Sequence, residues 1–396
     1  MNSQKVRVLK FGGSSVATPE LIRQVASIIK KQQALTPKLL VVVSAMGKST
    51  DQLLKLALDV SPNSTRYRRE VDMLLTTGER VSMALLSMAL EDQNISSISF
   101  TGSQSGIITD EEHGEAHIVE IRAQRIIEAL ASGKVVIVAG FQGVSRKKEI
   151  TTLGRGGSDT SAVALGAALG ADQVDIYTDV DGFYTADPRK IPAAKKIVEI
   201  PLRTAYLAAS RGAKVLHPRC LEIAYRHKTR VRVLSTFQPE NGGSMIVEKL
   251  SKTLEGPQVL QICRQDSLCL LKFPTTLSIE AQEVISSDYL EMKSDEHGTS
   301  VLLNEAQKNR WATRLTGHPA LLKVLDQSQN SLSRVSILGS GLDQASDMSQ
   351  KISSLFRAAE IDCLTGHQNE SQLDFLVKTK PSIDALMLNL HEEFIE

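Results

Sequence analysis

The sequence predicts an α/β protein, with a layered domain over residues 1–250 followed by two smaller α+β units. Three observations predict this fold: short apolar runs alternate with helix-like segments, each run ends at small or polar residues, and the pattern changes near Glu255. The chain of 396 residues is also too long for a single ordinary core. We therefore expect more than one domain.

The first domain is built on five expected strands, each a short apolar run. Such continuous runs are typical of parallel strands that helices cover on both faces. A helix-like segment from Pro19 to Lys31 follows the first run, with Pro19 well placed in the first turn. Ligands in open α/β sheets bind beyond the carboxyl ends of the strands, so the polar residues after each run are candidates for chemistry. The expected strands are Val6–Leu9, Leu39–Val43, Ile95–Phe100, Val135–Val138 and Val174–Tyr177.

The C-terminal region begins where Gly256-Pro257 breaks the chain. Short strands and helix-like segments then alternate twice, which predicts two α+β units over residues 256–330 and 331–396. These units are poor in glycine-rich and clustered charged motifs, so we expect the chemistry upstream. Their expected elements are strands at Val259–Cys263, Leu268–Phe273, Arg334–Leu338 and Gln372–Lys378, with helices at Met348–Ala359 and from Ser382 onward.

Composition excludes several classes of function. The net charge of +1 and the aromatic content of 4% argue against a nucleic-acid partner. The N-terminus has no apolar core of a signal peptide, and no run of about 18 apolar residues predicts a membrane span. The cysteines Cys220, Cys263, Cys269 and Cys363 have no CxxC spacing, which favours free thiols over a metal site or disulfides. We therefore expect a cytoplasmic protein.

Two early motifs concern phosphate binding. Lys10 precedes Gly12-Gly13 at a strand end, where backbone N–H groups can approach a phosphate and the lysine supplies positive charge. The alternative is a solvated strand end with a permissive turn. Gly47-Lys48-Ser49-Thr50 copies the end of a P-loop, but Val42 stands where that motif needs glycine. A Walker-type site is not expected, although Ser44–Thr50 can still line a pocket.

The segment Gly154–Ser161 is the most informative. Its three glycines keep the backbone open, and Arg155 can bind a carboxylate or phosphate with two parallel hydrogen bonds. We expect Ser158 or Asp159 to cap a helix over Thr160–Leu169, whose N-terminus then points at the same place. Asp159 stands where a dinucleotide fingerprint needs its third glycine, so that pattern fails. A capped helix after a flexible loop is the alternative, but it does not explain the arginine.

Three further segments each allow two interpretations. Thr178–Arg189 contains the turn formers Asp181-Gly182 and Asp187-Pro188, and it also suits a nucleotide pocket. Lys214 lies near a chain reversal, where a solvated lysine is the alternative, and His217 nearby is read as a packed or capping residue. Glu79, between two apolar helical segments, either receives an ammonium group or lies on the surface beside a capped helix start.

Six segments, taken together and in order, resemble the aspartate kinases of the amino-acid-kinase family. They are Lys10–Ser15, Val42–Gly47, Thr77–Arg80, Gly154–Ser161, Thr178–Arg189 and Lys214–Pro218. The resemblance covers roughly residues 5–247. It implies a three-layer αβα catalytic domain, ATP with Mg²⁺ as the phosphoryl donor, and L-aspartate as the acceptor. The implied product is 4-phospho-L-aspartate, which leads to lysine, methionine and threonine or to a specialised product.

The resemblance also implies a role for each site residue. Lys10 would stabilise the transferring phosphoryl group, and Asp159 would organise the lysines and the phosphate site. Arg155 would hold the α-carboxylate of aspartate, and Glu79 its ammonium group. The substrate pocket would be lined by Ser44, Thr50 and Ser158. The nucleotide would be held by Lys10, Gly12, Gly13, Thr178, Asp179, Tyr184, Arg189, Lys214 and Val215. Mg²⁺ would be held mainly through the phosphates rather than by protein ligands.

For the C-terminal region, the resemblance implies two ACT-like regulatory modules and a homodimer formed through them. The loop after the strand in such modules often carries a Pro-Gly pair. Gly339–Gln344 has no such pair, and Pro274-Thr275-Thr276 in the first module also departs from the pattern. Feedback control by lysine or threonine is therefore left open.

Two rival functions remain. The first keeps the fold and changes the acceptor to glutamate, acetylglutamate, a carbamate or a nucleotide monophosphate. Glu79 with Arg155 favours a free amino acid, but aspartate and glutamate differ by one methylene, worth only about 1–3 kcal/mol in a pocket. The second is a non-catalytic amino-acid sensor. It predicts the loss of Lys10, Arg155 or Asp159, and all three are present.

Overall fold

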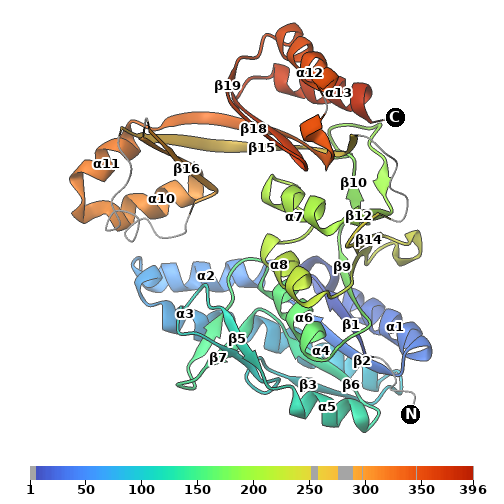
Figure 1. Cartoon of the computed structure of the whole chain (residues 1–396). Helices are drawn as coiled ribbons and strands as arrows, with labels where there is room; N and C mark the ends of the chain where they lie inside the picture. Colours follow the sequence, from blue (N-terminus) through green and yellow to red (C-terminus); the bar gives the residue numbers. More distant parts are fainter. Residues whose placement is uncertain (1–5, 251–256, 275–288, 297, 345, 396) are drawn as a thin grey trace. The chain divides into compact units, whose positions relative to one another are not determined.

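The computed structural model describes residues 6–250, 257–274, 289–296, 298–344 and 346–395 (Figure 1). The chain forms two compact units. Unit 1 consists of Met1–Phe183, Lys196–Tyr206 and Lys214–Ser251, and unit 2 of Tyr184–Lys195, Leu207–Ala213 and Lys252–Glu396. Two short inner segments of the chain therefore belong to unit 2. None of the described helices is long and apolar enough to cross a membrane.

Unit 1 is built on an eight-stranded sheet with the order β12-β14-β13-β9-β1-β2-β6-β3. The six strands from β13 to β3 are mutually parallel, so their carboxyl ends share one edge of the sheet. All five predicted strands are present. The strands are β1 (Val6–Phe11), β2 (Lys38–Val43), β3 (Ser97–Phe100), β6 (Val135–Ala139), β9 (Gln173–Thr178), β12 (Glu199–Pro201), β13 (Val231–Ser235) and β14 (Ser244–Val247).

Helices cover both faces of this sheet, which confirms the predicted αβα layers. On one face, Leu9 and Phe11 of β1 pack with residues of α1 (Pro19–Leu35) and α4 (Thr77–Glu91) in one buried cluster. Fully burying each such side chain stabilises the fold by about 1.5–3 kcal/mol. On the other face lies α6 (Gly157–Ala168), where Gly166 closely approaches Val8 and Val174. Since side chains alternate along a strand, Lys10 points to the same face as Val8, toward α6.

Unit 1 also contains a smaller sheet and further helices. A second, four-stranded sheet has the order β5-β4-β7-β8. Its strands are β4 (Ile107–Thr109), β5 (Ile118–Ile121), β7 (Gln142–Ser145) and β8 (Ile150–Thr152). The other helices are α2 (Ser49–Val60), α3 (Arg68–Leu75), α5 (Gln124–Ala131) and α8 (Pro218–His227). Three short elements lie where the chain passes from one unit to the other: β10 (Phe183–Tyr184), β11 (Lys196–Ile197) and α7 (Leu202–Ser210).

Unit 2 contains a six-stranded antiparallel sheet with the order β16-β17-β15-β18-β20-β19. Its strands are β15 (Gln258–Phe273), β16 (Glu291–Asp295), β17 (Gly298–Asn304), β18 (Gln329–Ser340), β19 (Cys363–Asn369) and β20 (Gln372–Lys378). Its helices are α10 (Glu305–Arg314), α11 (Pro319–Asp326), α12 (Ser346–Ala358) and α13 (Ser382–Phe394). The expected features at Gly256 and Thr275-Thr276 lie outside the described residues.

One long strand serves two cores in unit 2. The two short strands predicted around Cys263 and Leu271 form the single strand β15, with an irregular register between Gln265 and Leu268 where Ser267 has a φ of 59°. Ile262 in its first half belongs to the core under α12 and α13, whereas Leu271 in its second half packs with Trp311 of α10. The bulge turns the strand so that each half joins its own core.

Candidate active site

Two glycine-containing loops meet at the carboxyl edge of the unit 1 sheet. Gly13 follows β1, and Gly47 follows β2; the N–H of Gly47 donates to the carbonyl of Gly13 at 3.0 Å. A Cβ atom on Gly13 would lie 2.9 Å from the carbonyl oxygen of Ala45, so only glycine allows this approach. The N–H of Gly12 donates to Tyr177 at the end of β9 at 3.1 Å. The ends of three parallel strands are thereby held together.

Lys10 and Asp159 form an ion pair beneath these loops. The Nζ atom of Lys10 lies 2.5 Å from Oδ1 of Asp159, and both side chains are mostly buried. No donor among the described residues is aligned with that oxygen for a hydrogen bond, so the contact is an ion pair only. The predicted cap by Ser158 or Asp159 was wrong: α6 begins at Gly157 and its N-cap is Gly156, without a side-chain cap. The carboxylate is therefore free to face Lys10 instead of its own helix.

Glu79 is a buried carboxylate with one oxygen unsatisfied. It lies in the first turn of α4 and is only 3% exposed. Its Oε1 atom accepts from the backbone N–H of Ala45 at 3.2 Å, whereas Oε2 is buried and has no partner among the described residues. Burial raises the pKa of Glu79 to about 8. The surface interpretation of this residue is excluded, and a buried, half-satisfied carboxylate is a place where an ammonium group would be stabilised.

Hydroxyl groups surround the same region. Ser44 follows β2, and its carbonyl accepts from the Ser82 hydroxyl at 2.7 Å. Ser158 is buried in the first turn of α6, and Thr50 lies in the first turn of α2. Ser49 was not predicted as a site residue: its hydroxyl is buried without a partner among the described residues, and it lies close to Gly78. The segment Ser44–Thr50 had marked this stretch, but only the fold singles out Ser49.

Arg155 projects from a turn built on glycine. Gly156 has a φ of 67°, a left-handed conformation, and any Cβ there would clash with the His217 ring. The Arg155 side chain is exposed, and no described residue forms a hydrogen bond or ion pair with it. His217 is the N-cap of α8 and accepts from the N–H of Arg219, which confirms the capping interpretation. Burial lowers the pKa of His217, so this ring is a neutral acceptor at pH 7.

The predicted nucleotide residues divide between the two units. Thr178 ends β9 in unit 1 and Asp179 follows it; the Thr178 hydroxyl donates to Asp179 at 3.0 Å. Lys214 is exposed, and it and Val215 also belong to unit 1. Tyr184 and Arg189 belong to unit 2, where Arg189 pairs with Asp187 at 2.9 Å. Unit 1 alone thus brings together Lys10, Gly12, Gly13, Ser44, Glu79, Ser158 and Asp159.

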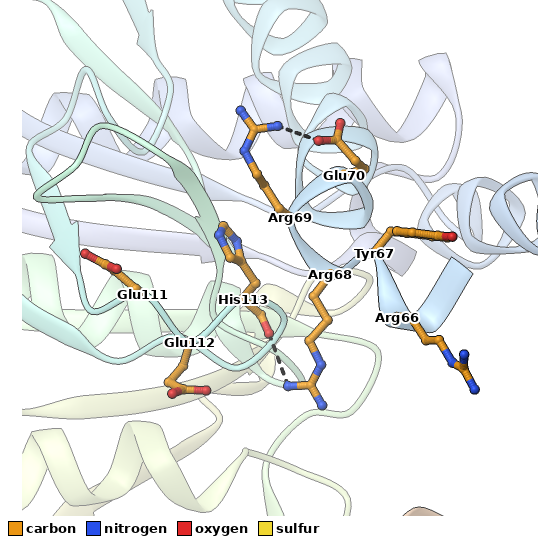
Figure 2. Close-up of a pocket in the computed structure, with 8 residues that line it drawn as sticks. All are labelled: Arg66, Tyr67, Arg68, Arg69, Glu70, Glu111, Glu112 and His113. Carbon is orange, nitrogen blue, oxygen red and sulfur yellow. Dashed lines mark hydrogen bonds and ion pairs between the residues drawn. The ribbon is translucent and has the colours of Figure 1, made fainter. Parts of the chain in front are cut away.

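A surface pocket lies elsewhere in unit 1, at the start of α3 (Figure 2). Its volume is about 410 Å³, and charged side chains dominate its lining. Arg69 in this pocket already pairs with Glu70 at 2.5 Å and Glu149 at 2.8 Å. The pocket is lined by Arg66, Tyr67, Arg68, Arg69, Glu70, Glu111, Glu112 and His113. Since none of these is a predicted site residue, we place the candidate site at the sheet edge.

The chain is similar to known proteins over most of its length. The chain matches the amino acid kinase family over residues 5–235, more than half of its length. It is 37% identical to an aspartokinase of Geobacillus stearothermophilus over 401 residues, which is 98% of this chain and 96% of that protein. An aspartokinase of Mycolicibacterium smegmatis is 50% identical over 236 residues, 59% of this chain and 56% of that protein.

The solved structures extend the likeness to the whole chain. The crystal structure of E. coli aspartokinase III in complex with aspartate and ADP aligns with a TM-score of 0.82 and 25% identity. The alignment covers 99% of this chain and 100% of that one, so it includes the C-terminal α+β region. The chain therefore belongs to the amino acid kinase family and, within it, to the aspartokinases.

Proposed function

We propose that this aspartokinase transfers the γ-phosphoryl group of ATP to the side-chain carboxylate of L-aspartate at the edge where Lys10, Asp159 and Glu79 lie. The observation that carries the proposal is the buried Glu79 carboxylate, with one oxygen unpaired, on the same sheet edge as the Lys10–Asp159 pair. An amino-acid substrate brings the positive group that Glu79 needs. Phosphoryl transfer, in turn, needs the positive charge that Lys10 supplies.

The ammonium group and the α-carboxylate of aspartate would each bind a side chain of opposite charge. The unpaired Oε2 of Glu79 would accept from the substrate ammonium group, and the unpartnered guanidinium of Arg155 would hold the α-carboxylate. Hydroxyls of Ser44, Thr50 and Ser158 would contact the remaining oxygens. Because each charge of the zwitterion gains a partner, the site suits a free amino acid better than an acylated one or a carbamate.

The transfer itself needs little proton chemistry. A carboxylate is ionised at pH 7, so its oxygen can attack the γ-phosphorus without a general base. The new O–P bond forms as the bond to the β–γ bridging oxygen breaks, and ADP leaves. Lys10 would stabilise the charge on the transferring group, while Asp159 holds its ammonium in place. The positive end of α6, which begins at Gly157, would add to this stabilisation.

The nucleotide would lie against the glycine loop and the end of β9. Gly12, Gly13, Thr178 and Asp179 lie at this edge in unit 1. Lys214 and Val215 belong to the same unit and are proposed to contact the nucleotide as well. Tyr184 and Arg189 are two further residues proposed to hold the nucleotide. Mg²⁺ would neutralise phosphate charge and be held mainly by phosphate oxygens and water. This fits the carboxylates here, since Asp159 pairs with Lys10 and Asp179 with the Thr178 hydroxyl.

We also propose the domain division 1–250, 256–330 and 331–396, with a homodimer formed through the two ACT-like modules. The likeness to E. coli aspartokinase III over 99% of the chain supports the modules. A monomeric mass by light scattering would contradict the dimer. The four unpaired cysteines fit a reducing compartment, which supports a cytoplasmic location.

The experiment is ADP release by the purified protein with ATP and Mg²⁺, comparing L-aspartate with L-glutamate. We expect release that depends on L-aspartate. Release with glutamate alone would move the proposal to the rival acceptor, and no release with either would favour the sensor. Adding lysine or threonine in turn shows whether the C-terminal modules sense these products.

A further inference from the structure

Arg219 contacts the backbone next to the turn that carries Arg155, and it is not among the site residues predicted from the sequence. It is in the first turn of α8 and is half-buried. Its Nη1 atom donates to the carbonyl of Leu153 at 2.7 Å, and its Nη2 atom donates to the carbonyl of Ala116 at 2.6 Å. Leu153 is two residues before Arg155. One guanidinium therefore joins α8 to two backbone segments that are distant in sequence.

The two carbonyls belong to segments that also contact each other. The N–H of Ala116 donates to the carbonyl of Thr152 at 2.9 Å, and the N–H of Leu153 donates to Phe141 at 2.8 Å. A Cβ atom on Gly154 would lie 3.1 Å from the carbonyl oxygen of Gly114. Arg219 thus binds the carbonyl of Leu153, the residue directly before the glycine turn.

A second buried residue fixes the same two segments from α3. The carboxylate of Asp72 is fully buried and accepts from Thr152 Oγ1 at 2.6 Å. It also accepts from the N–H of Gly114 at 3.1 Å and lies 2.8 Å from Nδ1 of His113. Asp72 holds one end of the paired segments and Arg219 the other. Between these contacts and the first turn of α6 lies Gly154–Gly156, which carries Arg155 and whose glycine carbonyls accept from the N–H groups of Gly157 and Thr160.

The partners of Arg219 indicate a geometric role. The Arg219 guanidinium donates to two neutral backbone carbonyls rather than to a carboxylate, so charge neutralisation does not explain these hydrogen bonds. Burying a guanidinium is costly, and two short charge-assisted bonds in a fixed fork offset that cost while fixing the backbone orientation. A lysine has a single ammonium nitrogen, whereas Arg219 uses two separate guanidinium nitrogens to reach the two carbonyls.

We propose that Arg219 is a positioning residue for aspartate binding: it fixes the backbone at Leu153 so that the turn presents Arg155 to the substrate α-carboxylate. This inference rests on the proposed role of Arg155. Without Arg219, the turn would sample more conformations, and the fraction in which Arg155 reaches the carboxylate would fall. The nucleotide loops at Gly12 and Thr178 are held by other contacts, so ATP binding should not change.

The test uses Arg219→Met, which keeps much of the side-chain volume and removes both donors, with Arg226→Met as control. Arg226 is exposed on the same helix. For Arg219→Met we expect the KM for aspartate to rise about tenfold or more, with the KM for ATP within about twofold. The control should match the wild type. If Arg219→Met does not fold, Arg219→Lys replaces it, with a smaller rise in the same constant.

A double variant separates this inference from the proposed function. In an Arg155→Ala background, Arg219→Met should raise the KM for aspartate no further, because both act through one contact. Additive effects, equal rises in both KM values, or no change in Arg219→Met would overturn the positioning role. Failure of the proposed function gives a different result: Arg155→Ala alone would then leave the KM for aspartate unchanged.

Discussion

Protonation of Glu79 should control both stability and aspartate binding. Burial raises its pKa from 4.5 to about 8, so between these pH values the folded protein holds a proton that the unfolded chain releases. At about 1.4 kcal/mol per pH unit, ionising Glu79 in the empty site costs roughly 5 kcal/mol. Stability without ligand should therefore fall as the pH rises from 4.5 to 8, and this contribution should be constant above pH 8.

The same proton should compete with the substrate ammonium group. If aspartate binds only when Glu79 is ionised, the KM for aspartate should be nearly constant above pH 8. Below pH 8 the KM should rise with each pH unit of acidification, with a limiting slope of roughly tenfold per unit. The assay is the KM for aspartate between pH 6 and 8.5 at saturating ATP, with Glu79→Gln measured in parallel. The glutamine cannot titrate, so its KM should be high and its pH profile flat.

A ligand without the ammonium group provides the control. Succinate is a dicarboxylate of the same length as aspartate but has no ammonium group that requires an ionised Glu79. Its inhibition should therefore not weaken as the pH falls from 8 to 6. A wild-type KM for aspartate that is flat across this range, or a Glu79→Gln variant that retains the wild-type slope, would rule out this role of Glu79. Thermal unfolding gives a second check: at pH 8 and without ligand, Glu79→Gln should be more stable than the wild type.

Three further predictions concern the sheet edge. Lys10→Ala and Asp159→Ala should each lower kcat by about 100- to 1,000-fold, since each removes charge organisation at the transferring group; near-normal turnover in steady-state assays would contradict this. Arg155→Ala should raise the KM for aspartate about tenfold to 100-fold with the KM for ATP unchanged, and equal changes in both constants would argue against its assignment. Gly140→Ala would place a Cβ atom 2.9 Å from the Cβ of Ser158, so the start of α6 must shift. We expect kcat to fall about tenfold. Unchanged kinetics would show that Gly140 and Ser158 pack less tightly than the structure indicates.

The strand ends could be predicted from the sequence because parallel strands that helices cover on both faces are continuous apolar runs, which are easily located. Continuous apolar runs located β1, β2 and β9, and the rule that ligands bind at carboxyl ends then marked Lys10 and Thr178. The Lys10–Asp159 pairing is different. It depends on which face of β1 the lysine occupies and on the side chain of Asp159 not capping its own helix, and the second condition was predicted wrongly.

Residues whose role depends on contacts with backbone groups far away in the sequence could not be predicted from local sequence patterns. Arg219 has no local motif of its own, and its partners are 66 and 103 positions away in the chain. Ser49 was identified only as part of a failed P-loop pattern, whereas its buried, unpartnered hydroxyl is a property of the fold. The continuity of β15 was also hidden, because the bulge near Ser267 interrupts its pattern and resembles a strand boundary.

The contribution of inner segments to unit 2 has no sequence signal either. Residues 184–195 follow a strand of unit 1, yet Ala186 and Ile191 lie in the core with Ile262 and Val335. The Thr185 hydroxyl lies 2.8 Å from Nε2 of His391 in α13. Short segments of this kind read as turns, because Asp187-Pro188 dominates their local pattern.

The proposal on which the others depend is that the edge containing Lys10 transfers phosphoryl to the aspartate side chain. It is tested most directly by trapping the acyl phosphate with hydroxylamine and measuring ADP and aspartyl β-hydroxamate in the same reaction. We expect equal amounts of both in the wild type and neither above background in Lys10→Ala. ADP without hydroxamate, or hydroxamate formed at a wild-type rate by Lys10→Ala, would contradict it.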